Sequence, residues 1–174
     1  MVQAFAAELG VPALGEGMRE YLERTGTDLH QLGHDGLRDV MCRLWAERQE
    51  QEARYNSFVA DRASYDFAAF WLYYHFTVSE SDTDLWFRET LAPGRYDHLF
   101  ILPWGTIPLV ADGVRSTNPY VQLHLQLLVE GLLRRHADVP PVALRATTLA
   151  SRLAELRLRV GGAVPTMDAP EALP

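Results

Sequence analysis

Apolar residues follow two different spacings along the chain, and together these predict helices that alternate with short strands. A spacing of three to four residues predicts helices over residues 1–10, 16–25, 37–54, 63–76, 83–91, 118–136 and 148–157. Short apolar runs predict strands over residues 11–14, 57–60, 99–102 and 139–144. This alternation predicts an α/β fold, with a parallel sheet covered by helices on both faces.

The ends of the predicted strands locate the candidate chemistry. Sites of parallel sheets lie at the carboxyl ends of the strands, which here are occupied by Asp61-Arg62 and by the loop 103–117. Residues 1–160 are expected to form one domain of ordinary size. Residues 161–174 contain three prolines and few residues to bury, so we expect a disordered tail.

Composition narrows the class of protein. A net charge of −7 and a pI near 5.3 argue against nucleic-acid binding, which needs a clustered basic surface. No apolar run reaches the roughly 18 residues of a membrane span, and the single cysteine, Cys42, fits a cytoplasmic protein without disulfides. All 16 basic residues are arginine, so chemistry that requires lysine is not available within these 174 residues.

The pair Asp61-Arg62 is the first candidate site. A carboxylate beyond a buried strand can accept a proton from a substrate hydroxyl or hold Mg²⁺ through water. The neighbouring guanidinium can bind a phosphate or carboxylate with two hydrogen bonds. The alternative is a strand-end turn with a surface ion pair.

A second candidate is the polar loop 112–118, in which Asn118 is expected to cap the following helix. Arg115 could close over a nucleotide and neutralise charge during phosphoryl transfer, and Asp112 is a candidate substrate contact. The alternative is an ordinary junction between a loop and a helix.

Three further residues are candidate substrate contacts. Glu16 and Arg19 begin a helix after a short strand and could hold polar groups of a substrate, or form a helix-surface pair. Trp71 lies on the aromatic-rich helix, where a ring could stack on a planar ligand or belong to the core. His30 and His34 have the spacing of metal ligands, but beside two glycines in a predicted loop they form no recognisable ligand pattern.

Taken in order, several segments resemble the NadR-like P-loop ATPase family, which includes nicotinamide riboside kinase domains. The strongest likeness is Arg95-Tyr96-Asp97-His98-Leu99-Phe100-Ile101-Leu102, followed by the lid-like segment 107–116. Gly15-Glu16-Gly17-Met18-Arg19-Glu20-Tyr21 resembles the family's substrate-side helix, and Phe58-Val59-Ala60-Asp61-Arg62 resembles its strand with an acidic end. The resemblance covers roughly residues 1–158 and implies a three-layer P-loop NTPase fold of the nucleoside kinase type.

The resemblance also implies roles for single residues. Asp61 would be the acid/base or the carboxylate on the Mg²⁺ side, and Arg62 and Arg115 would meet phosphate. Glu16 and Arg19 would face the acceptor substrate. In the complete family form the cofactors would be ATP and Mg²⁺.

One part of the family pattern has no counterpart in these residues. The family's first strand and its glycine-rich loop, which ends in Gly-Lys-Ser/Thr and cradles phosphates, would precede the helix over residues 1–10. That helix has no N-cap before it. We therefore expect the central strand and the loop to be missing from this chain, and the natural protein to start further upstream.

Two functions remain open from the sequence. The first is an ATP-dependent kinase-type domain that acts on a small hydroxyl-bearing metabolite such as a nucleoside, and that is inactive without the phosphate loop. The second is a non-catalytic binding or regulatory module, which keeps a site for a ligand or a protein partner.

Overall fold

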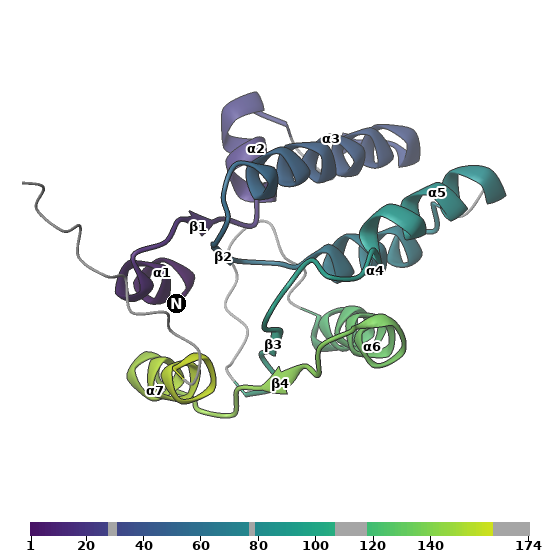
Figure 1. Cartoon of the computed structure of the whole chain (residues 1–174). Helices are drawn as coiled ribbons and strands as arrows, with labels where there is room; N and C mark the ends of the chain where they lie inside the picture. The colour runs from purple at the N-terminus through teal and green to yellow at the C-terminus, as the bar shows by residue number, and fades with distance from the viewer. Residues whose placement is uncertain (28–30, 77–78, 107–117, 162–174) are drawn as a thin grey trace, which may run out of the picture.

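The computed structural model describes residues 1–27, 31–76, 79–106 and 118–161. Helices and strands alternate as the sequence predicts (Figure 1). The helices are α1 (Val2–Leu9), α2 (Met18–Thr25), α3 (His34–Ala53), α4 (Ser64–Tyr73), α5 (Glu80–Thr90), α6 (Pro119–His136) and α7 (Leu149–Val160). The strands are β1 (Ala13–Leu14), β2 (Val59–Ala60), β3 (Phe100–Ile101) and β4 (Val142–Ala143).

The strands form two separate parallel pairs rather than the single sheet that the alternation predicts. β1 pairs with β2, in the register Ala13↔Val59. β3 pairs with β4, in the register Phe100↔Val142. No backbone hydrogen bond joins β2 to β3 within the described residues. The parallel direction is thus confirmed, but the sheet is divided between β2 and β3.

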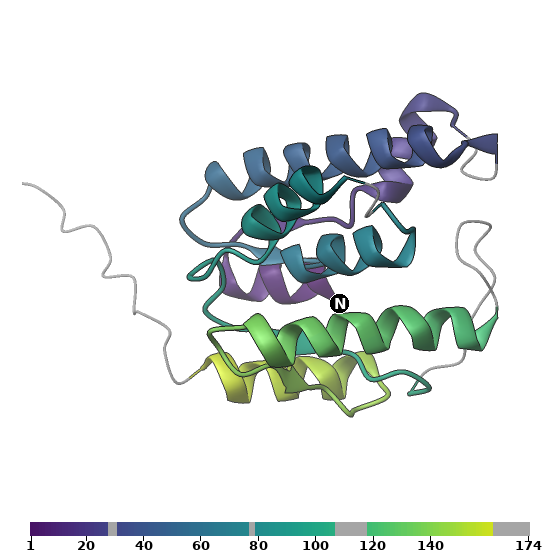
Figure 2. The same ribbon diagram turned by 90° about the vertical axis from the view of Figure 1, so that its right-hand side faces the viewer.

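Helices cover both faces of the strands, which gives three layers (Figures 1 and 2). On one face, α1 and α7 pack against residues of both strand pairs in a cluster of Phe5, Leu144, Leu153 and Leu156, with Val59 and Phe100 beside it. On the other face, α4 and α6 pack over β3 through Tyr65, Leu99 and Leu133. The two clusters use alternate residues of β3, because successive side chains of a strand point to opposite faces.

A larger aromatic core lies beyond the strands, between α2, α3, α4 and α5. Trp45, Trp71 and Trp86 are each at most 6% exposed, and the rings of Trp71 and Trp86 stack with centroids 4.5 Å apart. The aromatic residues of α4 therefore serve mainly as core. None of the described helices is long and apolar enough to span a membrane.

Helix ends agree with the sequence at three positions. Gly10 ends α1 in the left-handed conformation, with φ of 67°. Asn118 caps α6 by accepting a hydrogen bond from the Tyr120 N–H, and Thr148 caps α7. The start of α3 differs, since His34 was expected in a loop but opens the helix after Gly33.

Candidate functional site

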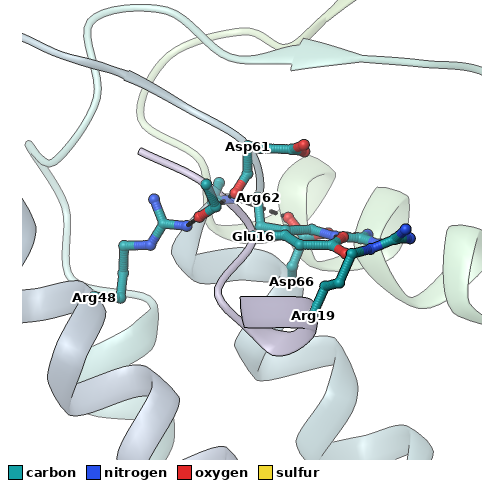
Figure 3. Close-up of polar contacts among 8 residues, drawn as sticks. Glu16, Arg19, Arg48, Asp61, Arg62 and Asp66 are labelled. Carbon is teal, nitrogen blue, oxygen red and sulfur yellow. Dashed lines mark hydrogen bonds and ion pairs between the residues drawn. The ribbon is translucent and has the colours of Figure 1, made fainter. Parts of the chain in front are cut away.

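The carboxyl ends of β1 and β2 meet at one edge of their sheet (Figure 3). The Asp61 N–H donates to the Leu14 carbonyl over 2.8 Å, which fixes the end of β2 beside the end of β1. Glu16 follows β1 and Asp61-Arg62 follow β2, so parallel pairing brings these segments together although they are 45 residues apart (61 minus 16). This placement agrees with the position predicted for the site.

Arg48, a residue of α3, ties the two strand ends together. Its side chain is buried, at 3% exposure, and its Nη2 donates both to the Gly15 carbonyl and to the Asp61 carbonyl, the latter over 2.9 Å (Figure 3). Both carbonyls lie just beyond the last ladder bonds of the strands. A charged donor therefore continues the pairing where the backbone ladder ends.

Arg62 lies between two carboxylates. Its Nη1 is 3.0 Å from Asp66 Oδ1, and its Nε is 3.8 Å from Glu16 Oε2. Glu16 in turn lies 3.9 Å from Arg19 Nε. The side chains thus alternate in charge, from Arg19 through Glu16 and Arg62 to Asp66 (Figure 3).

The backbone of Arg62 adopts a left-handed conformation, with φ of 76°. A residue with a Cβ in this region costs on the order of 1–3 kcal/mol unless its surroundings enforce it. Here Asp66 supplies the constraint, because one carboxylate oxygen binds Arg62 and the other accepts from the Ala63 N–H over 2.9 Å. The conformation aims the guanidinium at the network and over the ring of Phe70.

The electrostatics of the site are balanced rather than cationic. Burial alone would lower the pKa of Arg62, but the charge and hydrogen bond of Asp66, with Glu16 and Asp61, raise it, so the guanidinium stays charged. Two guanidiniums, Arg19 and Arg62, pair with two carboxylates, Glu16 and Asp66. This balance of charge favours a polar neutral or cationic ligand over a polyanion.

The Asp61 carboxylate lies apart from this network. Figure 3 shows it to one side of the Arg62 and Asp66 pair, with no ion pair drawn to either residue. It lines a cavity of about 400 Å³ that extends between β2 and β3. A carboxylate in this position can accept a hydrogen bond or a proton from a ligand hydroxyl.

The other predicted residues have different fates. Trp71 is 2% exposed, and its ring lies in the core, where its Nε1 donates to Thr83 Oγ1; for this residue the structure shows the core alternative. Asp112 and Arg115 lie outside the described residues, as do His30 and the tail from 162 onward. No group of three or more potential metal ligands occurs among the residues that the structure describes.

Two residues of the site were missed from the sequence. Asp66 stands four residues after Arg62 on the following helix, and that spacing is a readable signal for an ion pair. Arg48 gives a weaker signal, an arginine on the apolar face of α3 next to Leu44 and Trp45. Only the folded chain shows that it meets two strand-end carbonyls.

Comparison with known proteins gives one match. A family model described as an AAA domain matches residues 1–152. No curated protein and no solved structure matches the chain. The match covers most of the 174 residues, including both strand pairs and the cluster around Arg62. The chain therefore belongs to the AAA-domain family, whose members have the P-loop NTPase fold and bind nucleotides.

Proposed function

We propose that this chain is a kinase-type domain whose described site binds the hydroxyl-bearing acceptor of a phosphoryl transfer. The observation that carries the proposal is the cluster at the carboxyl ends of β1 and β2. There a charge-balanced network of Glu16, Arg19, Arg62 and Asp66 lies beside the separate carboxylate of Asp61. Membership of the AAA-domain family supports a nucleotide as the phosphoryl donor.

The described residues do not fit a Mg²⁺-triphosphate. Arg62 was expected to meet phosphate, but its guanidinium is already neutralised by Asp66 and Glu16. The 174 residues contain no lysine, and no cluster of metal ligands occurs in the described part of the chain. A phosphate role for Arg62 and a Mg²⁺ role for Asp61 remain predictions.

The same residues do fit an uncharged or cationic polyol such as a nucleoside. Glu16, just before α2, offers an acceptor, and Arg19, on the first turn of α2, offers a donor. Their side chains are 21% and 42% exposed, respectively. Asp61 is placed to accept the proton of the hydroxyl that attacks phosphorus. Positioning of that hydroxyl is the contribution that this part of the chain would make to catalysis.

The test is a binding cycle on Asp61 with nicotinamide riboside as the probe. Calorimetric titration should show binding, and the 5′-deoxy analogue should bind about tenfold more weakly because the Asp61 carboxylate loses its hydrogen bond. Asp61→Asn should weaken binding of the riboside by a similar factor. It should hardly change the affinity for the deoxy analogue, which has already lost the hydroxyl. The matched control Asp84→Asn, at an exposed position of α5, should leave both affinities unchanged.

Two outcomes of this titration would contradict the proposal. Equal affinities for the riboside and its deoxy analogue would show that Asp61 does not meet the acceptor hydroxyl. Micromolar binding of Mg-ATP to the 174 residues alone would show that the described residues supply a phosphate site after all. The second candidate function is a non-catalytic binding module. It predicts that the affinity for the riboside is unchanged in Asp61→Asn.

A further inference from the structure

The helix α4 begins without a side-chain cap of its own. Its N-cap residue is Ala63, which has no side-chain acceptor. The first N–H groups of a helix lack partners within the helix, and a serine, threonine, aspartate or asparagine side chain usually accepts from one of them. Here the N–H of Ser64, the first residue of α4, donates instead to the hydroxyl oxygen of Tyr96, over 2.8 Å. A tyrosine from another part of the chain thus does the work of the missing cap.

The hydroxyl of Tyr96 is also held from its other side. It donates to Glu52 Oε1 over 3.0 Å, and the second carboxylate oxygen of Glu52 accepts from Arg95 Nη1 over 2.9 Å. The guanidinium of Arg95 lies over the ring of Trp45, 4.9 Å from its centroid. Burial, and after it the charge of Glu52, raises the pKa of Tyr96. The hydroxyl therefore stays protonated and remains a donor to Glu52.

The turn that joins β2 to α4 carries part of the candidate site, because it includes Asp61 and Arg62. At its start, Arg48 binds the Asp61 carbonyl. At its end, Tyr96 binds the Ser64 N–H. The left-handed backbone of Arg62 lies between these two points, and a strained conformation of this kind persists only where its surroundings over-determine it. Tyr96 thus supports the same turn as Arg48, from the opposite end.

Both supports originate on one face of α3. Arg48 and Glu52 are four residues apart, so their side chains lie on the same side of the helix, and both are buried. A buried charge is costly unless it is paired. Arg48 binds the backbone at the start of the turn, and Glu52 binds the hydroxyl that reaches its end. The two buried charges of α3 therefore act on one short segment of backbone.

We propose that Tyr96 is a positioning residue of the candidate acceptor site, whose hydroxyl caps α4 from outside the helix and fixes the turn that carries Asp61 and Arg62. Its hydroxyl bonds to Ser64 and Glu52, so it acts on Asp61 through the backbone. The inference rests on the proposed function for the identity of the ligand. The effect of Tyr96 on the turn does not depend on any ligand.

The first test uses the free chain. Tyr96→Phe keeps the ring, which packs edge-on against Phe58, and removes only the hydroxyl. Amide hydrogen exchange at Ser64, measured by NMR relative to the N–H of Leu144, should become at least about tenfold faster. The ratio is informative because a general loss of stability speeds exchange at both amides, whereas loss of the cap speeds it at Ser64 alone.

Tyr65→Phe is the matched control. Tyr65 is also buried, but its hydroxyl donates to the His136 carbonyl, 3.5 Å away, and not to the turn. The variant therefore loses a tyrosine hydroxyl next to Ser64 in the sequence without losing the cap. The ratio of exchange rates at Ser64 and Leu144 should stay at its value in the natural chain.

The second test measures affinity for nicotinamide riboside by calorimetric titration. Tyr96→Phe should weaken binding about fivefold or more, because the turn no longer holds Asp61 in place. In the Asp61→Asn background the same change should cost much less, since effects of residues that act through one another are not additive. Tyr65→Phe should leave the affinity unchanged.

Three results would overturn the proposal. The first is an unchanged exchange ratio in Tyr96→Phe, and the second is an equal change in Tyr65→Phe. The third is an equal loss of riboside affinity from Tyr96→Phe in the natural and Asp61→Asn backgrounds, because Tyr96 would then not act through Asp61. A natural chain that binds no riboside contradicts the proposed function instead, and the exchange ratio still decides the role of Tyr96.

A measurement on the natural chain decides the question if Tyr96→Phe does not fold. A hydroxyl that is buried between Glu52 and the Ser64 N–H should exchange its proton slowly enough to be observed by NMR, with a cross-peak to the Ser64 N–H. Absence of this cross-peak would contradict the cap.

Discussion

At the scale of single residues, Arg48 connects the two strand ends that carry the candidate site. Its guanidinium is buried and binds two carbonyls that no strand partner reaches, those of Gly15 and Asp61. Removal of a charged donor from buried acceptors leaves them unsatisfied, which costs more than the hydrogen bonds gain when formed. Arg48 thus holds both Glu16 and Asp61 in place through the backbone.

We predict that Arg48→Met lowers the free energy of unfolding by about 2–4 kcal/mol, because the two carbonyls lose their donor while the apolar stem is retained. Urea unfolding followed by circular dichroism measures the difference. Arg43→Met is the control, since Arg43 lies exposed on the same helix, and it should change stability by at most about 0.5 kcal/mol. Equal stability of the two variants would contradict this role of Arg48.

At the residue scale, the sequence identified candidate residues of the site but not the partners with which their side chains interact. Glu16, Arg19 and Arg62 were each named as candidates from the sequence, but their chain of ion pairs at the ends of β1 and β2 was not predicted. The expected pairing of Arg62 with phosphate missed Asp66, whose carboxylate lies within 3.0 Å. Ion-pair partners depend on the direction of the side chain, and the left-handed backbone of Arg62 sets that direction. The sequence does not signal this conformation, because the position is not a glycine.

At the scale of elements, α1 and α7 are joined across the ends of the chain by an ion pair. Arg157 donates to both carboxylate oxygens of Glu8, over 2.8 and 2.7 Å. These two helices cover the face that spans both strand pairs. The hydrogen bond from Arg157, with its charge, lowers the pKa of Glu8.

This pair predicts a pH-dependent contribution to stability. Because the pKa of Glu8 is lower in the folded chain, the contribution is complete above the unfolded value of about 4.3 and is lost as the pH falls through the folded value. The urea midpoint of Glu8→Gln should therefore lie below that of the natural chain at pH 7, and the difference should shrink toward pH 3. Glu23→Gln, at an exposed position, should show no such trend; a Glu8→Gln difference that stays constant would contradict the assignment.

The predicted helix ends agree with the structure where residues at the end itself determine them. Gly10, Asn118 and Thr148 end or begin helices as their types favour. The strands are shorter than the apolar runs, two residues each, because only residues with a paired neighbour count as strand. Pairing depends on the whole sheet, so the length of an apolar run overestimates the length of the strand.

At the scale of the whole molecule, the main feature is the division of the sheet between β2 and β3. Two parallel pairs lie between layers of helices, with the candidate acceptor site at the carboxyl end of one pair. The alternation of elements predicted the layers and the strand direction. It did not predict the division, because hydrophobic patterning reports which residues are buried and not which edges are paired; a missing central strand was expected only from the family resemblance.

The most direct test of this account is amide hydrogen exchange on the free chain, measured residue by residue by NMR. The divided sheet predicts slow exchange at Asp61, Val142 and Leu144, whose N–H groups donate within the pairs. It predicts fast exchange at Ala60 and Phe100, because the pairing of β2 with β1 and of β3 with β4 directs these N–H groups away from the partner strand. Protection of Ala60 and Phe100 equal to that of Asp61 and Val142 would contradict it, because it would show that β2 and β3 are already joined.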